Sequence, residues 1–144
     1  MNIPIQQYLP HRAPMQMVDT ITNISSTHVV TEFTISSSCI FVAKGVFAEI
    51  GLIENMAQTC SAIVGQFIYE QHDKPNLIGY ISTIKKSEIY ELPIEGQTIR
   101  TEATLLSQID TEDYTLCAMK CSTYEQSTLL ATAELNLVIK NLSL

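Results

Sequence analysis

The chain of 144 residues is short of charged side chains, and basic ones are the scarcest. Charged residues make up 16% of the sequence, whereas an average globular domain has about 25%. Only 8 Lys and Arg residues stand against 15 Asp and Glu residues, a formal net charge of -7. Nucleic acid binding needs a basic face that releases counterions from phosphates, so this charge balance argues against that function.

Other absences narrow the class of protein further. The four cysteines form no CxxC pair, and the first residues lack the basic and then apolar layout of a secretion signal, so we expect free thiols in a reducing cytoplasm. No His or Cys spacing predicts a metal site. The most apolar stretch, 40–68, contains too many polar residues to span a membrane, namely Lys44, Glu49, Glu54, Asn55 and Gln58.

One long apolar segment and several alternating segments carry the structural signal. Residues 47–69 lack proline and repeat apolar residues at spacings of three and four, which predicts a helix of ~20 residues, about 30 Å long. So little of its circumference is polar that protein must surround it. Residues 28–35 alternate like a half-buried strand, and four further β-rich runs are expected at 77–86, 97–107, 114–123 and 128–140.

These elements predict one α+β domain over residues 1–144. The simplest way to bury such a helix is to wrap an antiparallel sheet around it. A sheet curled in this way keeps an open edge, and pairing that edge with a second copy is a common solution. We therefore expect a homodimer.

Glu54 is the first candidate for chemistry, because it lies inside the apolar helix. Burial raises the pKa of a carboxyl group toward the range that suits a general acid or base at neutral pH. Alternatively, Glu54 lies on a narrow solvated face together with Asn55 and Gln58, and the helix alone does not decide. Gln58 lies one turn further along the same face, where it orients the Glu54 carboxyl, contacts a ligand or is simply solvated.

His11 is the second candidate, in the stiff segment LPHRAP at residues 9–14. An imidazole between two prolines either docks this N-terminal arm or acts as a catalytic base. No carboxylate or nucleophile lies beside it in the sequence, so docking is the favoured interpretation.

Two segments resemble one known family. LPHRAPMQMVD at 9–19 resembles the LPHRxPxxxVD signature of 3-hydroxyacyl-[acyl-carrier-protein] dehydratases, and GLIENMAQ at 51–58 resembles their central-helix motif. The resemblance extends over essentially the whole chain and is strongest to the branch of aryl-polyene pigment pathways. It implies the hotdog fold, a long helix wrapped by a curved antiparallel sheet, with acyl-thioester tunnels between paired subunits.

The resemblance also implies a site, and one of its residues is missing. Glu54 and Gln58 match the family's catalytic Glu and the amide that follows it. The family's catalytic His lies in an HFPG segment, fourteen positions before that Glu, and works with the Glu of the other subunit. Here that position is Ile40, although the adjacent Phe41 matches. An isoleucine transfers no proton, so the imidazole must come from elsewhere or the reaction differs.

Substrate binding is expected at Phe41 and at the helix start, Glu49, Ile50 and Gly51, whose backbone amides are suited to polarising a thioester carbonyl. The substrate would be carried on the phosphopantetheine of acyl carrier protein or on CoA, with no other cofactor. Because acyl carrier protein is acidic, a basic patch should dock it. The candidates are Lys44, Lys85, Lys86 and Arg100, although scattered solvated side chains are the simpler interpretation.

Three functions remain open from the sequence. The first is a dehydratase-like lyase in which His11, another group or a partner subunit replaces the missing imidazole. The second is a non-catalytic subunit that binds acyl carrier and assembles with an active paralogue, as a heterodimer or a higher oligomer. The third is an acyl thioester hydrolase in which the helix carboxylate activates water.

Overall fold

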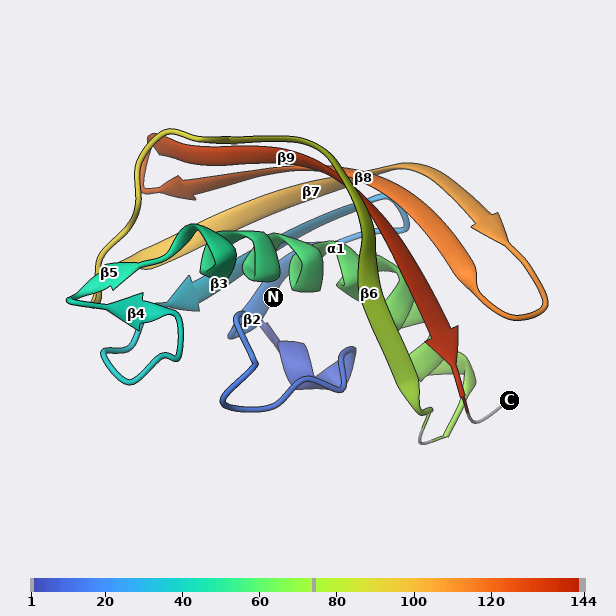
Figure 1. Ribbon diagram of the computed structural model, residues 1–144. Coiled ribbons are helices and arrows are strands. Elements are labelled where there is room, and N and C mark those ends of the chain that lie inside the picture. The colour runs from blue at the N-terminus through green and yellow to red at the C-terminus, as the bar shows by residue number, and fades with distance from the viewer. Residues whose placement is uncertain (1, 74, 143–144) are drawn as a thin grey trace.

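In the computed structural model, which describes residues 2–73 and 75–142, one helix lies in the hollow of a curved sheet (Figure 1). The helix, α1, spans Glu49–Gln71. All neighbouring strands of the sheet are antiparallel. Across the sheet, the strand order is β1 (Ile3–Pro4), β2 (Thr20–Ile24), β3 (His28–Thr34), β7 (Thr98–Asp110), β8 (Thr115–Glu125), β9 (Thr128–Asn141) and β6 (Leu77–Ile89). The predicted α+β architecture is confirmed.

The helix begins two residues later than its apolar pattern predicts, because Phe47 belongs to a hairpin. Strands β4 (Val42–Ala43) and β5 (Val46–Phe47) pair through a two-residue tip, Lys44 and Gly45, both with positive φ. Such a tip suits the twist of a tight hairpin. The Phe47 amide donates to the Pro93 carbonyl at 2.9 Å, so it belongs to an extended segment, and α1 starts beyond it.

The core forms between α1 and the concave face of the sheet. Leu52, Met56, Cys60 and Ile63 of α1 are fully buried, at the spacing of three and four that marks one helix face. Polar side chains in this layer are hydrogen-bonded to one another, as buried polar groups generally are. Thr31 and Thr59, for example, lie 2.7 Å apart through their hydroxyl oxygens.

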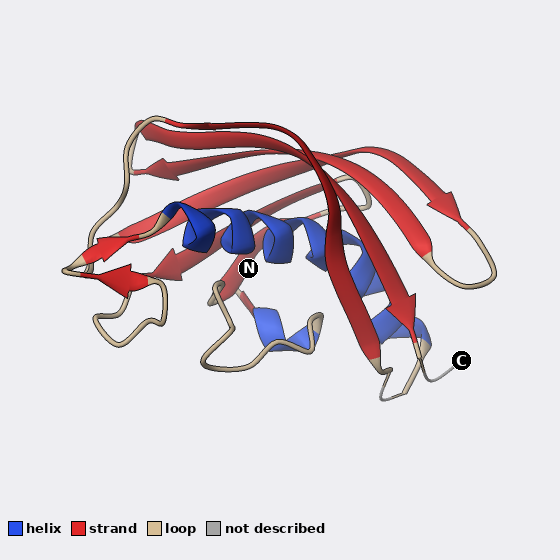
Figure 2. Ribbon diagram, in the orientation of Figure 1, coloured by secondary structure: helices blue, strands red, loops and turns tan. Residues whose placement is uncertain are grey.

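An N-terminal arm, residues 5–19, covers the side of α1 that the sheet leaves open. It contains the short 3-10 helix η1 (Ile5–Gln7) and then an irregular segment, seen below α1 in Figure 2. Ile5 and Leu9 are buried, and the Tyr8 hydroxyl donates to Glu70 Oε1 at 2.9 Å. At Gly65 a Cβ would collide with the Tyr8 carbonyl, so the arm lies this close only because that residue is glycine.

Strand β6 ends the sheet. Within the described residues it pairs with β9 alone, which leaves its other edge open. Three large apolar side chains of this strand, Ile78, Tyr80 and Ile84, are exposed. A long edge strand with exposed apolar residues is a template for pairing with another chain. None of the described helices is long and apolar enough to cross a membrane.

Candidate active site

The fold brings His11, Glu54 and Gln58 together around one small cavity of about 40 Å³. His11 comes from the arm, and Glu54 and Gln58 come from successive turns of α1. The third wall is β6, through Gly79 and Tyr80. Three segments far apart in the sequence therefore meet at the half-buried Glu54 carboxyl.

Gln58 holds both the carboxyl and the arm. Its Nε2 donates to Glu54 Oε1 at 2.9 Å and to the Met15 carbonyl at 2.8 Å, and its Oε1 accepts the Met17 amide at 2.8 Å. Gln58 is the fourth residue after Glu54, the spacing at which side chains meet on a helix surface. Glu54 Oε1 is therefore engaged by Gln58, and among the described residues no hydrogen bond reaches Oε2.

Asn55 supports the site, although the sequence offered it only as part of the alternative in which Glu54 lies on a solvated face. Asn55 and Gln58 are each only 1% exposed, so the solvated-face interpretation is wrong for both. Asn55 Nδ2 donates to the Met17 carbonyl at 2.7 Å, and its Oδ1 accepts the Thr101 hydroxyl at 2.6 Å. The available signal was a pair of amides three residues apart on an otherwise apolar helix.

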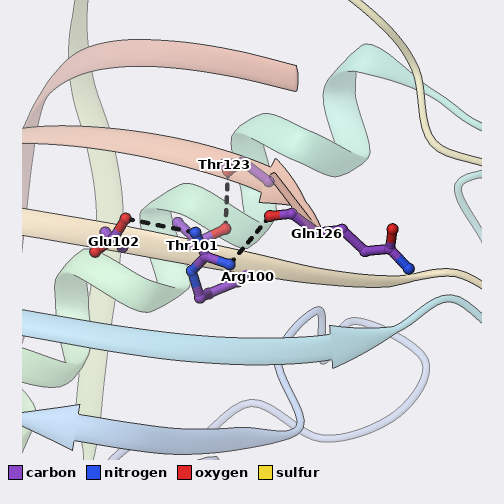
Figure 3. Close-up of polar contacts among 5 residues, drawn as sticks. All are labelled: Arg100, Thr101, Glu102, Thr123 and Gln126. Carbon is purple, nitrogen blue, oxygen red and sulfur yellow. Dashed lines mark hydrogen bonds and ion pairs between the residues drawn. The ribbon is translucent and has the colours of Figure 1, made fainter. Parts of the chain in front are cut away.

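A chain of hydrogen bonds runs through Asn55 from the sheet to the arm. Because the Thr101 hydroxyl gives its proton to Asn55, the Thr123 hydroxyl must be the donor to Thr101, at 2.8 Å (Figure 3). The order of donors is therefore Thr123 on β8, Thr101 on β7 and Asn55 on α1, ending at the Met17 carbonyl. These hydrogen bonds fix the position of the arm relative to α1 in the helical turn that contains Glu54.

His11 lies on the cavity wall with one ring nitrogen enclosed. Its Nδ1 is buried and has no hydrogen-bond partner among the residues described. Burial lowers the pKa of His11 below its usual 6.5, Glu54 opposes this shift, and the Arg12 guanidinium reinforces it. Arg12 stays beside the imidazole because its Nη1 donates to the carbonyls of Leu9 and His11, at 3.0 and 2.8 Å.

The start of α1 offers backbone donors. Ala48 provides no side-chain cap, and the Gly51 amide donates back to the Ala48 carbonyl at 2.9 Å. In the part of the chain that the structure describes, the amides of Glu49 and Ile50 have no acceptor. Uncapped amides at a helix start favour an anion or a polarised carbonyl.

Gly51 and Phe41, two residues expected to bind substrate, lie in a closely packed part of the structure. The Phe47 ring occupies the space that a Cβ at Gly51 would need, 2.6 Å away, and Phe41 Cβ lies 3.0 Å from it. Gly51 and Phe41 are therefore closely packed at the helix start, and neither lines the cavity around Glu54. Their contact with substrate stays a prediction. Ile40, at the position of the family's catalytic imidazole, is 48% exposed.

The four basic candidates for carrier docking do not gather in one place. Arg100 on β7 is separated from Lys85 and Lys86 on β6 by strands β8 and β9. Its guanidinium is already engaged, since it donates to the Gln126 carbonyl at 3.2 Å and lies 3.9 Å from Glu102 Oε2 (Figure 3). Among the residues described, no group of three or more His, Cys, Asp or Glu could hold a metal ion, and all four cysteines are free thiols.

Comparison with known proteins gives a consistent picture. The family described as ApeP-like, ApeP dehydratase, matches residues 3–143. The 3-hydroxyacyl-[acyl-carrier-protein] dehydratase FabZ of Methylobacterium nodulans is 33% identical over 101 residues, which cover 66% of this chain and 63% of that protein. FabZ of Bradyrhizobium sp. strain BTAi1 is 32% identical over the same length, 66% of this chain and 65% of that protein. The chain thus spans less than two thirds of the length of these relatives.

Solved structures confirm the hotdog fold. The dehydratase heterocomplex ApeI:P from Xenorhabdus doucetiae matches with a TM-score of 0.84 and 23% identity, over 98% of this chain and 93% of the matched chain. A hypothetical thioesterase from Streptococcus pneumoniae, solved with coenzyme A, matches with a TM-score of 0.62 and 11% identity, over 84% of each chain. At these identities the likeness concerns the fold.

Proposed function

Since the chain belongs to the ApeP-like dehydratase family, we propose that it is a subunit of a lyase that dehydrates 3-hydroxyacyl thioesters. The observation that carries this proposal is the Glu54 carboxyl, oriented by Gln58 on a cavity wall shared with His11. The FabZ relatives, which are 3-hydroxyacyl-[acyl-carrier-protein] dehydratases by name, support the same chemistry. We place the reaction in fatty acid or polyene-type biosynthesis in the cytoplasm.

Dehydration needs two proton-transfer groups. A base removes a proton from C2, the electrons of that C–H bond form the C2=C3 double bond, and the C3–O bond breaks. The leaving hydroxyl takes a proton and departs as water. We assign that last transfer to Oε2 of Glu54, because Oε1 is held by Gln58. The ionised carboxyl must first take up a proton from solvent, and the base returns the C2 proton to solvent, so the cycle balances.

We assign the polarisation of the thioester carbonyl to the start of α1. Ile50 lies four residues before Glu54, about 6 Å along the helix axis, and it is 62% exposed. A carbonyl oxygen bound by the free amides of Glu49 and Ile50 would place C2 and C3 beside the Glu54 turn. The thiol carrier is phosphopantetheine on acyl carrier protein or CoA, and we propose no other cofactor.

The base at C2 is the missing group, and we assign it to a second subunit. One wall of the cavity is β6, whose outer edge is open within the described chain, so a strand pairing there would bring its subunit to the cavity. A homodimer would present Ile40 at the imidazole position in both copies. A paralogue that keeps the imidazole would complete the cavity, and the similar fold in a dehydratase heterocomplex supports that arrangement.

The test is to purify the chain alone and together with a paralogue from the same genome that keeps the HFPG segment. Each preparation is incubated with a 3-hydroxyacyl carrier protein, and the product is identified by mass spectrometry. We expect enoyl product only from the mixture. In that mixture Glu54→Gln should lower kcat by roughly 10²–10⁴-fold, whereas Glu91→Gln, at an exposed residue outside the cavity, should have no effect.

The other outcomes are equally informative. Free acid as the product would identify a thioester hydrolase. Binding of the carrier with no turnover in any mixture would identify a non-catalytic carrier-binding subunit. Full dehydratase activity in the Glu54→Gln mixture would refute the role of Glu54.

A further inference from the structure

We propose that His11 acts as a neutral hydrogen-bond donor to the departing oxygen of the substrate, and not as a base. The inference rests on the proposed dehydration for the identity of that oxygen. It is carried by two features of the structure: His11 lines the same cavity as Glu54, and its Nδ1 is enclosed without a partner.

The enclosed nitrogen decides where the ring carries its proton. A neutral imidazole has one N–H and one bare nitrogen, whereas an imidazolium has an N–H at both positions. An N–H at Nδ1 would be a buried donor without an acceptor, and such donors are rare because they are costly. The proton of the neutral ring therefore resides on Nε2, and a second proton on Nδ1 is disfavoured.

The charges around the ring support the neutral form. Arg12 lies beside it on the arm and disfavours an imidazolium, and Glu54 on α1 favours one. Burial outweighs the carboxylate, so the pKa of His11 lies below its usual 6.5. Of the β6 and β9 residues that line this wall with His11, Tyr80 is titratable, and Leu77, Gly79 and Ile139 carry no ionisable group.

An imidazole in this state is a poor base and a good donor. A proton on the enclosed Nδ1 would be a buried donor without an acceptor, and Nε2 already holds a proton. What remains for the substrate is the Nε2–H group, which donates a hydrogen bond at any pH at which the ring is neutral. The surroundings of His11 therefore change the role that its residue type predicts.

The order of groups along α1 indicates that His11 faces the 3-hydroxyl oxygen of the substrate. The free amides of Glu49 and Ile50 lie at the helix start, Glu54 lies one turn later, and His11 shares the cavity wall with Ala57 and Ser61 beyond it. A substrate with its carbonyl at the amides directs C3 toward Glu54 and His11. As the C3–O bond breaks, its electron pair moves to oxygen. The Glu54 carboxyl, which has taken up a proton before this step, supplies that proton, and the Nε2–H hydrogen bond stabilises the developing charge.

The first experiment determines the tautomer and the charge of His11 in the purified chain by long-range ¹H–¹⁵N NMR. We expect the Nε2–H tautomer at pH 7.5 and a pKa below 6.5. Arg12→Gln should raise that pKa and Glu54→Gln should lower it further, because each removes one neighbouring charge. His28 and His72 are internal controls whose signals should not move. An Nδ1–H tautomer, or an imidazolium at pH 7, would overturn the proposal.

The second experiment compares two substitutions in the active assembly. His11→Gln keeps an N–H donor of similar reach but cannot act as a base, whereas His11→Leu has no donor. We expect His11→Leu to lose roughly 10²–10³-fold in kcat, the usual effect of one donor to a developing oxyanion, and His11→Gln to recover most of that loss. Equal loss in both variants would identify a base and overturn the proposal.

The two experiments separate the two proposals. If no assembly dehydrates the substrate, the proposed function fails, and the NMR measurement still decides the protonation of His11. If the assembly is active, the pH profile of kcat/KM gives a further check. The profile is compared with that of the His11→Gln assembly, because the imidazole of the second subunit titrates in both. If His11 stays neutral, the two profiles have the same shape between pH 8 and 7, whereas a fall in activity that requires His11 would contradict the proposal.

Discussion

Substituting methionine for Gln58 removes three hydrogen bonds while it keeps the length and bulk of the side chain. The amide of Met17 loses its acceptor, and Met17 is buried, so this donor is left unsatisfied at about 1–3 kcal/mol. The carbonyl of Met15 belongs to an exposed residue, where water replaces the lost donor. Together with the lost bond to Glu54, worth about 1 kcal/mol, the expected loss in the free energy of unfolding is roughly 2–4 kcal/mol.

Urea unfolding of the purified chain measures this loss. Gln66→Met is the matched control, because Gln66 is the same residue type on the same helix and makes one hydrogen bond at its exposed end, to the Ser25 carbonyl. We expect the control to lose less than about 1 kcal/mol. A Gln58→Met loss no larger than that of the control would refute the argument that Gln58 clamps the arm to α1.

Two other predictions follow from close contacts and buried groups. Gly65→Ala should lower the free energy of unfolding by about 1–3 kcal/mol, because its Cβ would meet the Tyr8 backbone. Gly79→Ala should be tolerated, because the nearest atom to its Cβ would lie 3.6 Å away, in Ile139. Paired thermal or urea unfolding curves measure both variants, and equal losses would contradict the argument from contacts. Burial raises the pKa of Cys117 from 9.0 to about 11. Above pH 9 the unfolded chain therefore loses this proton while the folded chain keeps it, so the free energy of unfolding should fall between pH 9 and 11. Cys117→Ala should flatten that fall, and an unchanged slope would show that other groups cause it.

The main elements of the fold could be predicted because each has a strong internal pattern. The apolar repeat places a helix at 47–69, and the observed α1 is displaced by only two residues. The four strands after it are found at the predicted places. Each extends further at its C-terminal end, and β7 and β8 begin one residue later than predicted. The short strands β1, β4 and β5 have two residues each. No periodicity exists in two residues, so such strands are defined by their partners alone.

The site was predictable in part. Glu54 stands out as a carboxylate in an apolar helix, and helix spacing links it to Gln58. That His11 meets Glu54, 43 positions further along the chain, depends on the path of the arm, which no local pattern encodes. The residue type of Asn55 does not tell a buried amide from a solvated one, and only its contacts with Met17 and Thr101 show that it is buried. For such residues, burial is a property of the assembled layers.

Gln58 links the chemistry of the site to the stability of the arm. The same amide group that donates to Glu54 also donates to the Met15 carbonyl, and its oxygen accepts the Met17 amide. The arm that these bonds hold in place carries His11 to the cavity. A displacement of the arm therefore removes the two backbone groups that orient the Gln58 amide, and it removes the imidazole from the cavity at the same time. For this reason, changes at Gly65 or Asn55, neither of which lines the cavity, should impair the site through the position of the arm.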